Sequence, residues 1–280
     1  MEPFEYFAPT SIAEASEILA HYAGSARVVA GGTDLLLKMK ADRLAPQAVV
    51  NIKRIPDLRG LAMNSHLTIG ALTTLEELRC TPVVRQHYGS LADAAATMAS
   101  VQIRNLATVG GNLCNAAPSA DLAPILIALR AVACIVGSQG ERRVPLDEFF
   151  VGPGKTVLEV DELLAAVEAP PPSGPALYLK HSSRECMDIA VAGVGLSLQM
   201  ADERCAEARI VLGAVAPTPL RARRAEEALI EGALTPDRIG RAAHLAADEA
   251  KPIDDVRGAA WYRRKMIEVL TRRGLKAIAE

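Results

Sequence analysis

Two Gly-Gly pairs, each with a hydroxyl residue nearby, constrain this chain more than any other feature. The first pair follows the apolar residues Val28 and Val29, and the second follows Thr108 and Val109. Glycine has no Cβ, so its backbone can approach a ligand closely, and successive N–H groups in such turns form concavities that bind anions. A diphosphate that bridges two parts of one domain is the ligand that such paired turns suit. A tight strand-to-helix turn is the alternative for either pair alone.

Strand and helix patterns alternate in the first part of the chain. Ser11 and Glu14 form a capping-box pattern ahead of an amphipathic helix that we expect to end near Tyr22. The other expected strands are 27–30, 48–52, 67–70 and 132–136, and the other expected helices are 34–41, 89–99 and 122–129. Because the glycine turns lie between such elements, the pattern predicts layers of the α/β or α+β kind.

The segment Val167–Pro175, with four prolines, is the clearest break in composition. Proline with Ser and Gly disfavours regular elements, so we place a domain boundary here. Strands are expected next at 176–180, 190–199 and 208–215, the last two as an antiparallel pair, and then helices at 222–232, 236–250 and 258–278. The pair Thr235-Pro236 caps the middle helix. We therefore expect two domains, 1–172 and 173–280, the second small and α+β.

Ligand spacings and charge exclude several classes of function. The five cysteines are scattered without a C-x-x-C, and the five histidines show no metal-ligand spacing. We expect no metal and no iron–sulfur cluster in this chain. A net charge of −2 gives no argument for nucleic acid. The most apolar stretch, 122–136, is too short to cross a membrane, and the N-terminus lacks a signal pattern, so a cytoplasmic location is expected.

Two nucleotide-binding motifs fail on inspection. Gly152-Pro153-Gly154-Lys155-Thr156 looks like part of a phosphate-binding P-loop, but Phe149 stands where that loop requires a glycine. Gly193 and Gly195 lack the third glycine of a dinucleotide-binding G-x-G-x-x-G and lie in a strand pattern. We reject a nucleoside triphosphatase, and the sequence disfavours a Rossmann domain.

Residues 28–40, 100–125 and 146–190 resemble the FAD-binding subunit of the molybdenum hydroxylases. This family includes xanthine dehydrogenase, aerobic carbon monoxide dehydrogenase and 4-hydroxybenzoyl-CoA reductase. Both glycine turns match the glycine loops of the family, and Asp121 and Lys180 stand at matching places. The short run from Asn112 to Asp121 leaves no room for the iron–sulfur insertion of 4-hydroxybenzoyl-CoA reductase, which makes that member a poorer match.

The resemblance implies an α+β fold: a two-subdomain FAD-binding domain of the vanillyl-alcohol-oxidase type, followed by a small C-terminal domain. It also implies roles for individual residues. Amides of the first turn would bind the diphosphate, and Asp34 is alternatively a helix cap. Asp121 would accept ribityl hydroxyls, or cap the helix that follows, and Lys180 would tune the flavin. The implied FAD-binding residues are Val29, Ala30, Gly31, Gly32, Thr33, Asp34, Leu35, Thr108, Gly110, Gly111, Asn112, Asp121, Leu163 and Lys180.

Three smaller expectations belong to the same site. Leu163 matches a position whose backbone contacts the flavin ring, and Met98 stands where relatives place an aromatic residue against the adenine. Cys114, between the second glycine turn and Asp121, is expected to serve packing rather than redox chemistry. Lys180 has a solvated strand-end lysine as its alternative.

The resemblance further implies an electron-transfer subunit that works with an iron–sulfur small subunit and a molybdenum large subunit, as a dimer of heterotrimers. Iron–sulfur clusters and molybdopterin would then reside on those partners, and NAD or another acceptor would receive the electrons. Two alternatives stay open: a self-sufficient FAD-dependent oxidase or dehydrogenase, and an assembly subunit without flavin. The segment after the boundary is small for the substrate domain that the first alternative needs.

Overall fold

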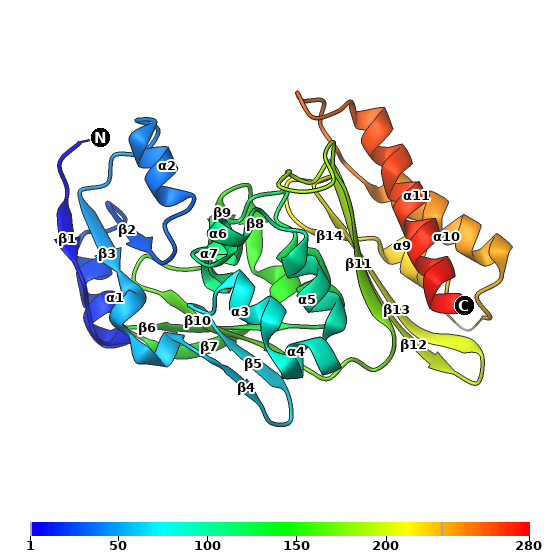
Figure 1. Ribbon diagram of the computed structural model, residues 1–280, viewed down its shortest axis with the longest axis horizontal. Coiled ribbons are helices and arrows are strands. Elements are labelled where there is room, and N and C mark those ends of the chain that lie inside the picture. The colour runs from blue at the N-terminus through cyan, green and yellow to red at the C-terminus, as the bar shows by residue number, and fades with distance from the viewer. Residues whose placement is uncertain (1, 231) are drawn as a thin grey trace.

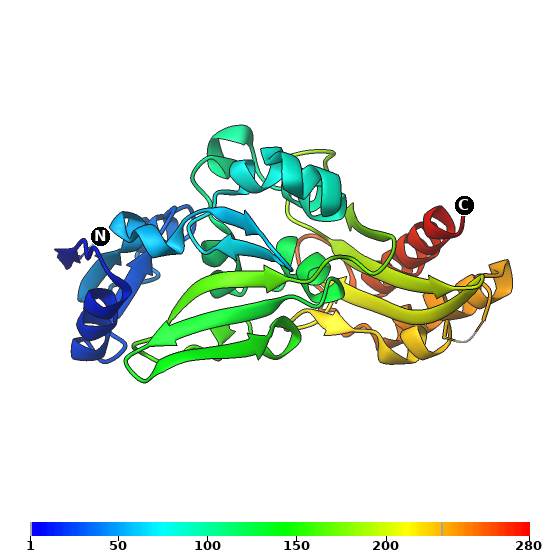
Figure 2. The same cartoon turned by 90° about the horizontal axis from the view of Figure 1, so that it is seen from below.

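The computed structural model describes residues 2–230 and 232–280 and shows three larger sheets arranged along one long axis, together with one two-stranded sheet. In Figure 1 the N-terminal sheet lies at one end, a larger sheet with its helices lies in the middle, and the C-terminal sheet and helices lie at the other end. Figure 2, turned by 90°, shows the same succession, with the two termini at opposite ends. The described chain is therefore a mixture of helices and sheets, as the sequence predicts.

The N-terminal sheet is small and parallel. Its strand order is β1-β3-β2, and Val28 pairs with Val50. Ser11 caps α1 by accepting the N–H of Glu14, as predicted, whereas the Glu14 carboxylate accepts the N–H of Thr10. The elements are β1 (Glu5–Phe7), α1 (Ile12–His21), β2 (Ala26–Val29), α2 (Leu35–Lys40) and β3 (Ala48–Asn51).

The middle sheet is antiparallel and contains the largest core of the molecule. Its order is β4-β5-β10-β6-β7, and buried residues such as Leu126 and Ile135 fill the space between this sheet and its helices. The strands are β4 (Leu61–Met63), β5 (Leu67–Gly70), β6 (Val132–Gly137), β7 (Gly140–Pro145) and β10 (Leu163–Ala169). The helices are α3 (Leu75–Cys80), α4 (Pro82–His87), α5 (Gly89–Ala96), α6 (Val101–Arg104), α7 (Val109–Asn115) and α8 (Leu122–Ala128).

The segment that looks like a P-loop is a β-hairpin. Strand β8 (Phe150–Gly152) pairs with β9 (Lys155–Thr156), and the preceding Phe149 is fully buried. A P-loop joins a strand to a helix, and here a strand follows instead. The prediction that this segment is not a P-loop is confirmed.

The C-terminal part pairs an antiparallel sheet with helices, as predicted. One face of β12 packs on α8, where a Cβ on Gly195 would lie 2.6 Å from the carbonyl oxygen of Pro124. The other face is covered by α10 and α11. Thr235 caps α10 with Pro236 as its first residue. The elements are β11 (Ala176–His181), β12 (Ala192–Ala201), β13 (Arg204–Gly213), β14 (Leu220–Arg221), α9 (Arg223–Glu227), α10 (Pro236–Glu249) and α11 (Ala260–Ala279).

Two helix predictions run too long. The helix expected at 222–232 ends at Glu227, because Ile230 forms a bridge with Cys205 of β13. The helix expected at 89–99 ends at Ala96, and Ala99 adopts a left-handed φ of 45°. In each case a contact or turn with the rest of the chain outweighs local helix preference.

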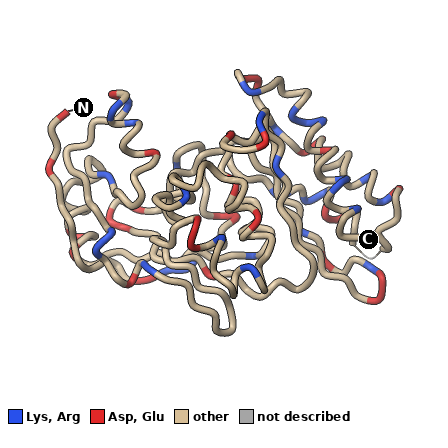
Figure 3. Tube along the Cα trace, in the orientation of Figure 1, with Lys and Arg blue, Asp and Glu red and all other residues tan. Residues whose placement is uncertain are grey.

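Charge and hydropathy of the described chain fit the sequence analysis. Figure 3 shows Lys and Arg interleaved with Asp and Glu along the trace, in all three sheet regions. Among residues 2–230 and 232–280, every helix is too short or too polar to cross a membrane.

Candidate functional site

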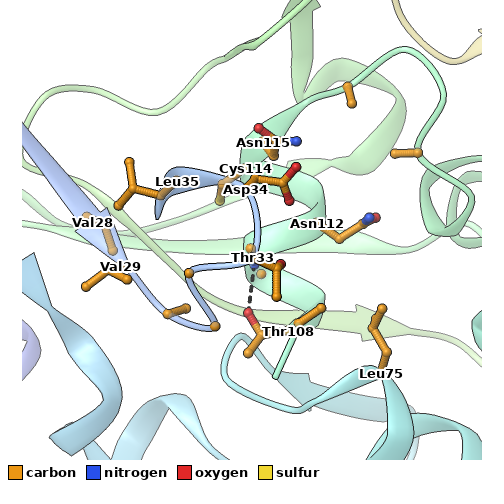
Figure 4. Close-up of a pocket in the computed structure, with 18 of the residues that line it drawn as sticks. Val28, Val29, Thr33, Asp34, Leu35, Leu75, Thr108, Asn112, Cys114 and Asn115 are labelled. Atoms are coloured by element: carbon orange, nitrogen blue, oxygen red, sulfur yellow. Dashed lines mark hydrogen bonds between the residues drawn. The ribbon is translucent and has the colours of Figure 1, made fainter. Parts of the chain in front are cut away.

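Both glycine turns line one cavity of about 750 Å³. Figure 4 shows the first turn passing beside α7, with Thr33 close to Thr108 and Asn112 in this view and Asp34 close to Cys114 and Asn115. Leu163 of β10 lines the same cavity. Of the predicted site residues, all but Lys180 contribute to the wall of this cavity: Val29, Ala30, Gly31, Gly32, Thr33, Asp34, Leu35, Thr108, Gly110, Gly111, Asn112, Asp121 and Leu163.

The two turns touch through Gly31. A Cβ built on Gly31 would lie 2.0 Å from the carbonyl oxygen of Leu106, just before the second turn. Gly32 has a φ of +75°, which side-chain-bearing residues rarely adopt. The first position therefore requires glycine for close backbone approach and the second for its conformation.

The first turn keeps its amides open. The carbonyl of Gly32 accepts the N–H of Leu36 in the first turn of α2. The N–H groups of Gly31, Gly32 and Thr33 donate to no backbone or side-chain group of the described chain. Asp34 occupies the position before α2, yet its side chain makes no capping bond. Three consecutive open donors at a cavity wall form the anion-binding arrangement that the sequence predicts.

The second turn contributes in another way, because its amides are already used. Gly110 donates to the carbonyl of Ala71 at 2.8 Å, and Gly111 donates to the Thr108 hydroxyl oxygen at 3.0 Å, which caps α7. The side chain of Asn112 remains: its Oδ1 is buried and has no partner among the described residues. A buried acceptor at a cavity wall is costly unless a ligand donates to it.

Asp121 joins the start of α8 to the C-terminal sheet. Its Oδ1 accepts the Tyr178 hydroxyl at 2.6 Å, and its Oδ2 accepts the Lys180 ammonium at 3.0 Å. All three side chains are buried, and burial raises the pKa of Asp121 while Lys180 and Tyr178 oppose that rise. Asp121 stands before α8 but makes no side-chain cap, so the capping alternative is wrong.

Lys180 lies behind Asp121 rather than in the cavity wall. Its ammonium also donates to the carbonyls of Asp188 at 2.8 Å and Thr97 at 3.2 Å, so each of its three protons has a protein acceptor. The solvated-lysine alternative is wrong, since only 7% of its side chain is exposed. Lys180 therefore fixes Asp121 and the loop around Asp188, which lines the cavity.

The Met98 end of the cavity is held by a buried arginine. Arg104 donates to the carbonyls of Met98 at 2.9 Å and Ala99 at 3.3 Å, and its Nε binds Glu76 at 2.9 Å. Met98 and Ala99 both line the cavity. Arg79 and Arg104 together lower the pKa of Glu76 to about 2.

Replacing Glu76 by glutamine should reduce the loss of folding stability that occurs as the pH is lowered. The folded pKa of about 2 lies below the ordinary value of 4.5, so the ionised Glu76 stabilises the fold above pH 4.5 and loses this effect as the pH falls toward 2. Urea unfolding at several pH values between those limits should show a steeper loss for the wild type than for Glu76→Gln. Parallel curves would contradict this assignment.

The cavity also contains residues that sequence reasoning missed. Lys38 of α2 and Asn115 of α7 line it and bind each other, and Met187 and Ile189 line it from the loop after β11. The role of Tyr178 beside Asp121 could have been predicted from the sequence. Tyr178 stands two residues before Lys180, and residues two apart on a strand point to the same face of the sheet. Burial raises the pKa of the Cys114 thiol to about 12, so this thiol stays protonated, which supports the packing role.

Family comparisons agree with this geometry. The family model described as "FAD binding domain in molybdopterin dehydrogenase" matches residues 2–172, and "CO dehydrogenase flavoprotein C-terminal domain" matches residues 177–278. The chain belongs to the FAD-binding subunits of the molybdenum hydroxylase family. Members of this family are flavoprotein subunits of oxidoreductase complexes, with molybdenum and iron–sulfur clusters on other subunits.

Individual relatives match along nearly the whole chain. The carbon monoxide dehydrogenase medium chain of Hydrogenophaga pseudoflava is 34% identical over 98% of this chain and 96% of its own length. A putative xanthine dehydrogenase FAD-binding subunit of Escherichia coli K12 is 33% identical over 96% of this chain and 93% of its own. The solved H. pseudoflava carbon monoxide dehydrogenase, which lacks the Mo-pyranopterin moiety, superposes with a TM-score of 0.95 at 35% identity, covering 99% of this chain and 98% of that one.

The residues present fit FAD, the cofactor of this family. Three open amides suit the oxygens of a diphosphate, the unpartnered Asn112 Oδ1 suits a hydroxyl or amine donor, and the volume suits a large ligand. When bound, FAD supplies the hydride and single-electron chemistry. The chain supplies binding, orientation and the surrounding charge.

Proposed function

We propose that this chain binds FAD at the cavity and serves as the electron-transfer subunit of a molybdenum-containing dehydrogenase complex. Electrons would enter from an iron–sulfur subunit and leave to NAD or another acceptor. The observation that carries the proposal is the meeting of both glycine turns and Asp121 at one cavity, in a chain whose whole length matches the family.

Each part of the cavity would bind a different part of FAD. The open amides of Gly31, Gly32 and Thr33 would donate to the diphosphate, and Asp121 has lone pairs left for ribityl hydroxyls. The backbone at Leu163 would lie along the flavin ring, with Met98 at the adenine. Lys180 would act on the flavin through Asp121, since its own ammonium is enclosed by protein acceptors.

We extend the proposal to the organisation of the complex. The two domains, 1–172 and 173–280, would share the cofactor between them, because Asp121 and Lys180 come from different sides of the boundary. The partners would be an iron–sulfur small subunit and a molybdenum large subunit, in a dimer of heterotrimers located in the cytoplasm.

Reconstitution tests the proposal. The purified full chain, freed of flavin and then mixed with FAD, should show the visible absorption bands of a bound flavin after gel filtration. The co-expressed complex should contain iron and molybdenum and should reduce an acceptor, with NAD⁺ compared against an artificial dye. The absence of bound flavin after FAD addition would overturn the proposal. Rapid oxidation of an organic substrate by the isolated chain with oxygen would favour the self-sufficient enzyme instead.

A further inference from the structure

The cavity wall contains more acidic than basic side chains, which is unfavourable for an anionic ligand such as FAD. Among the described residues its charged members are Arg27, Lys38, Asp34, Asp121, Glu162 and Asp188. FAD brings a diphosphate with negative charge, so the cations of the wall decide whether this charge is compensated. Glu162 is already paired with Arg142 at 2.7 Å, and Asp121 with Lys180.

The two cations differ in what they bind. Arg27 donates to two carbonyls of its own turn, those of Gly24 at 2.6 Å and Ala26 at 2.7 Å. The Lys38 ammonium donates to the neutral side-chain oxygen of Asn115 at 2.7 Å, and it takes part in none of the ion pairs found in the described chain. Among the described residues neither cation forms an ion pair, but Arg27 is held by two carbonyls of its own turn, whereas the Lys38 ammonium has one neutral side-chain acceptor.

The position of Asn115 places this charge close to the diphosphate site. Asn112 and Asn115 are three residues apart on α7, so their side chains are neighbours on one helix face, with Cβ atoms about 5–6 Å apart. Asn112 carries the buried Oδ1 without a partner. A lysine stem has four rotatable carbons, so a small rotation can carry the ammonium from Asn115 toward a ligand at Asn112.

We propose that Lys38 is the cation that binds the diphosphate of FAD, with Asn115 as its resting partner when no anion is present. The proposal rests on the FAD-binding function proposed above and adds a charge contact to the open amides of the first turn. Lys38 extends from α2 toward α7, so its contact with the diphosphate would also link the two glycine turns across the bound ligand. Hydrogen bonds between ions are roughly twice as strong as neutral ones.

A fluorescence titration of the flavin-free full chain with FAD tests this role. Lys38→Met should raise the Kd for FAD about tenfold, which is the size expected for one charged hydrogen bond. The affinity of the wild type should fall with ionic strength more steeply than that of Lys38→Met, because salt screens an exposed charge. Lys38→Arg should keep most of the affinity.

Lys40→Met is the matched control, because Lys40 lies on the same helix but not in the cavity wall. Wild-type affinity in this control supports the proposal. Equal weakening in both methionine variants would show a general effect of surface charge and overturn it, as would an unchanged Kd in Lys38→Met. The midpoint potential of bound FAD should be the same in Lys38→Met and wild type; a shift would assign Lys38 to the flavin ring instead. A wild type that binds no FAD would overturn the proposed function itself.

Discussion

Replacing Gly31 by alanine is expected to weaken the binding of FAD by about a hundredfold. The new Cβ would stand 2.0 Å from the Leu106 carbonyl oxygen and 2.7 Å from its carbon, and both atoms belong to the backbone. The backbone cannot rotate away as a side chain would, so the first turn must move off the second. Overpacking of this kind costs about 1–3 kcal/mol of folding stability.

The larger effect falls on binding, because both turns contribute to the same cavity wall. A displaced first turn moves the open amides of Gly31, Gly32 and Thr33 away from Asn112, so one ligand no longer contacts both. We expect the Kd for FAD to rise by about a hundredfold, the equivalent of about 2.8 kcal/mol. Flavin absorption after gel filtration and fluorescence titration would measure this.

Gly240→Ala is the control for that substitution. Gly240 lies inside α10, and a Cβ there would meet no atom within 4 Å. Alanine in a helix interior is more favourable than glycine by about 0.5–1 kcal/mol, so this variant should bind FAD normally and unfold at slightly higher urea. Gly31→Ala with wild-type affinity for FAD would show that the turns do not need their close contact.

Local signals in the sequence predict much of this structure. Strand β5 has the predicted bounds Leu67–Gly70, and the cap at Thr235 lies where the Thr-Pro pair places it. Such features depend on residues that are close together in the sequence, so they can be predicted without knowledge of the fold. The glycine turns belong to the same class, since glycine adopts the left-handed φ of Gly32 without the strain that a side chain would bring.

Contacts between distant segments could not be predicted in the same way. Lys38 and Asn115 are 77 residues apart, and nothing near either residue signals the other. The bonded amide of Gly110 likewise depends on the carbonyl of Ala71, which only the folded chain brings close, whereas Gly111 donates to the local cap Thr108. Sequence reasoning thus named residues that the fold brings to one cavity, but it did not separate a turn with open amides from a turn whose amides are already bonded.

The second large effect concerns Lys180. Removing one partner of a buried ion pair leaves a buried charge without compensation, which costs about 3–5 kcal/mol. We expect Lys180→Met to lose about that much free energy of unfolding at pH 7, because Asp121 stays buried with only the Tyr178 hydroxyl as a donor. Tyr178→Phe, which removes a neutral donor and leaves the ion pair, should lose about 1–3 kcal/mol.

The pH dependence separates the charge effect from simple loss of packing. Burial already raises the pKa of Asp121 above its ordinary 3.8, and removal of Lys180 takes away the largest influence that lowers it. A raised folded pKa destabilises the fold at high pH, and this penalty disappears as the pH falls through that pKa. The difference in unfolding free energy between Lys180→Met and wild type should therefore narrow as the pH is lowered from 7 toward the ordinary aspartate value of 3.8.

The double variant Asp121→Asn with Lys180→Met should recover much of the loss at pH 7, because an amide carries no charge to leave unpaired. Recovery of stability need not restore the cofactor site, since Lys180 also holds the Asp188 carbonyl at 2.8 Å. We expect the double variant to be stable yet to bind FAD more weakly than the wild type, because the loop that lines the cavity at Asp188 has lost its anchor. The charge of Asp121 would not be involved if the difference in unfolding free energy between Lys180→Met and wild type were independent of pH. A double variant no more stable than Lys180→Met would likewise show that Lys180 acts through its packing.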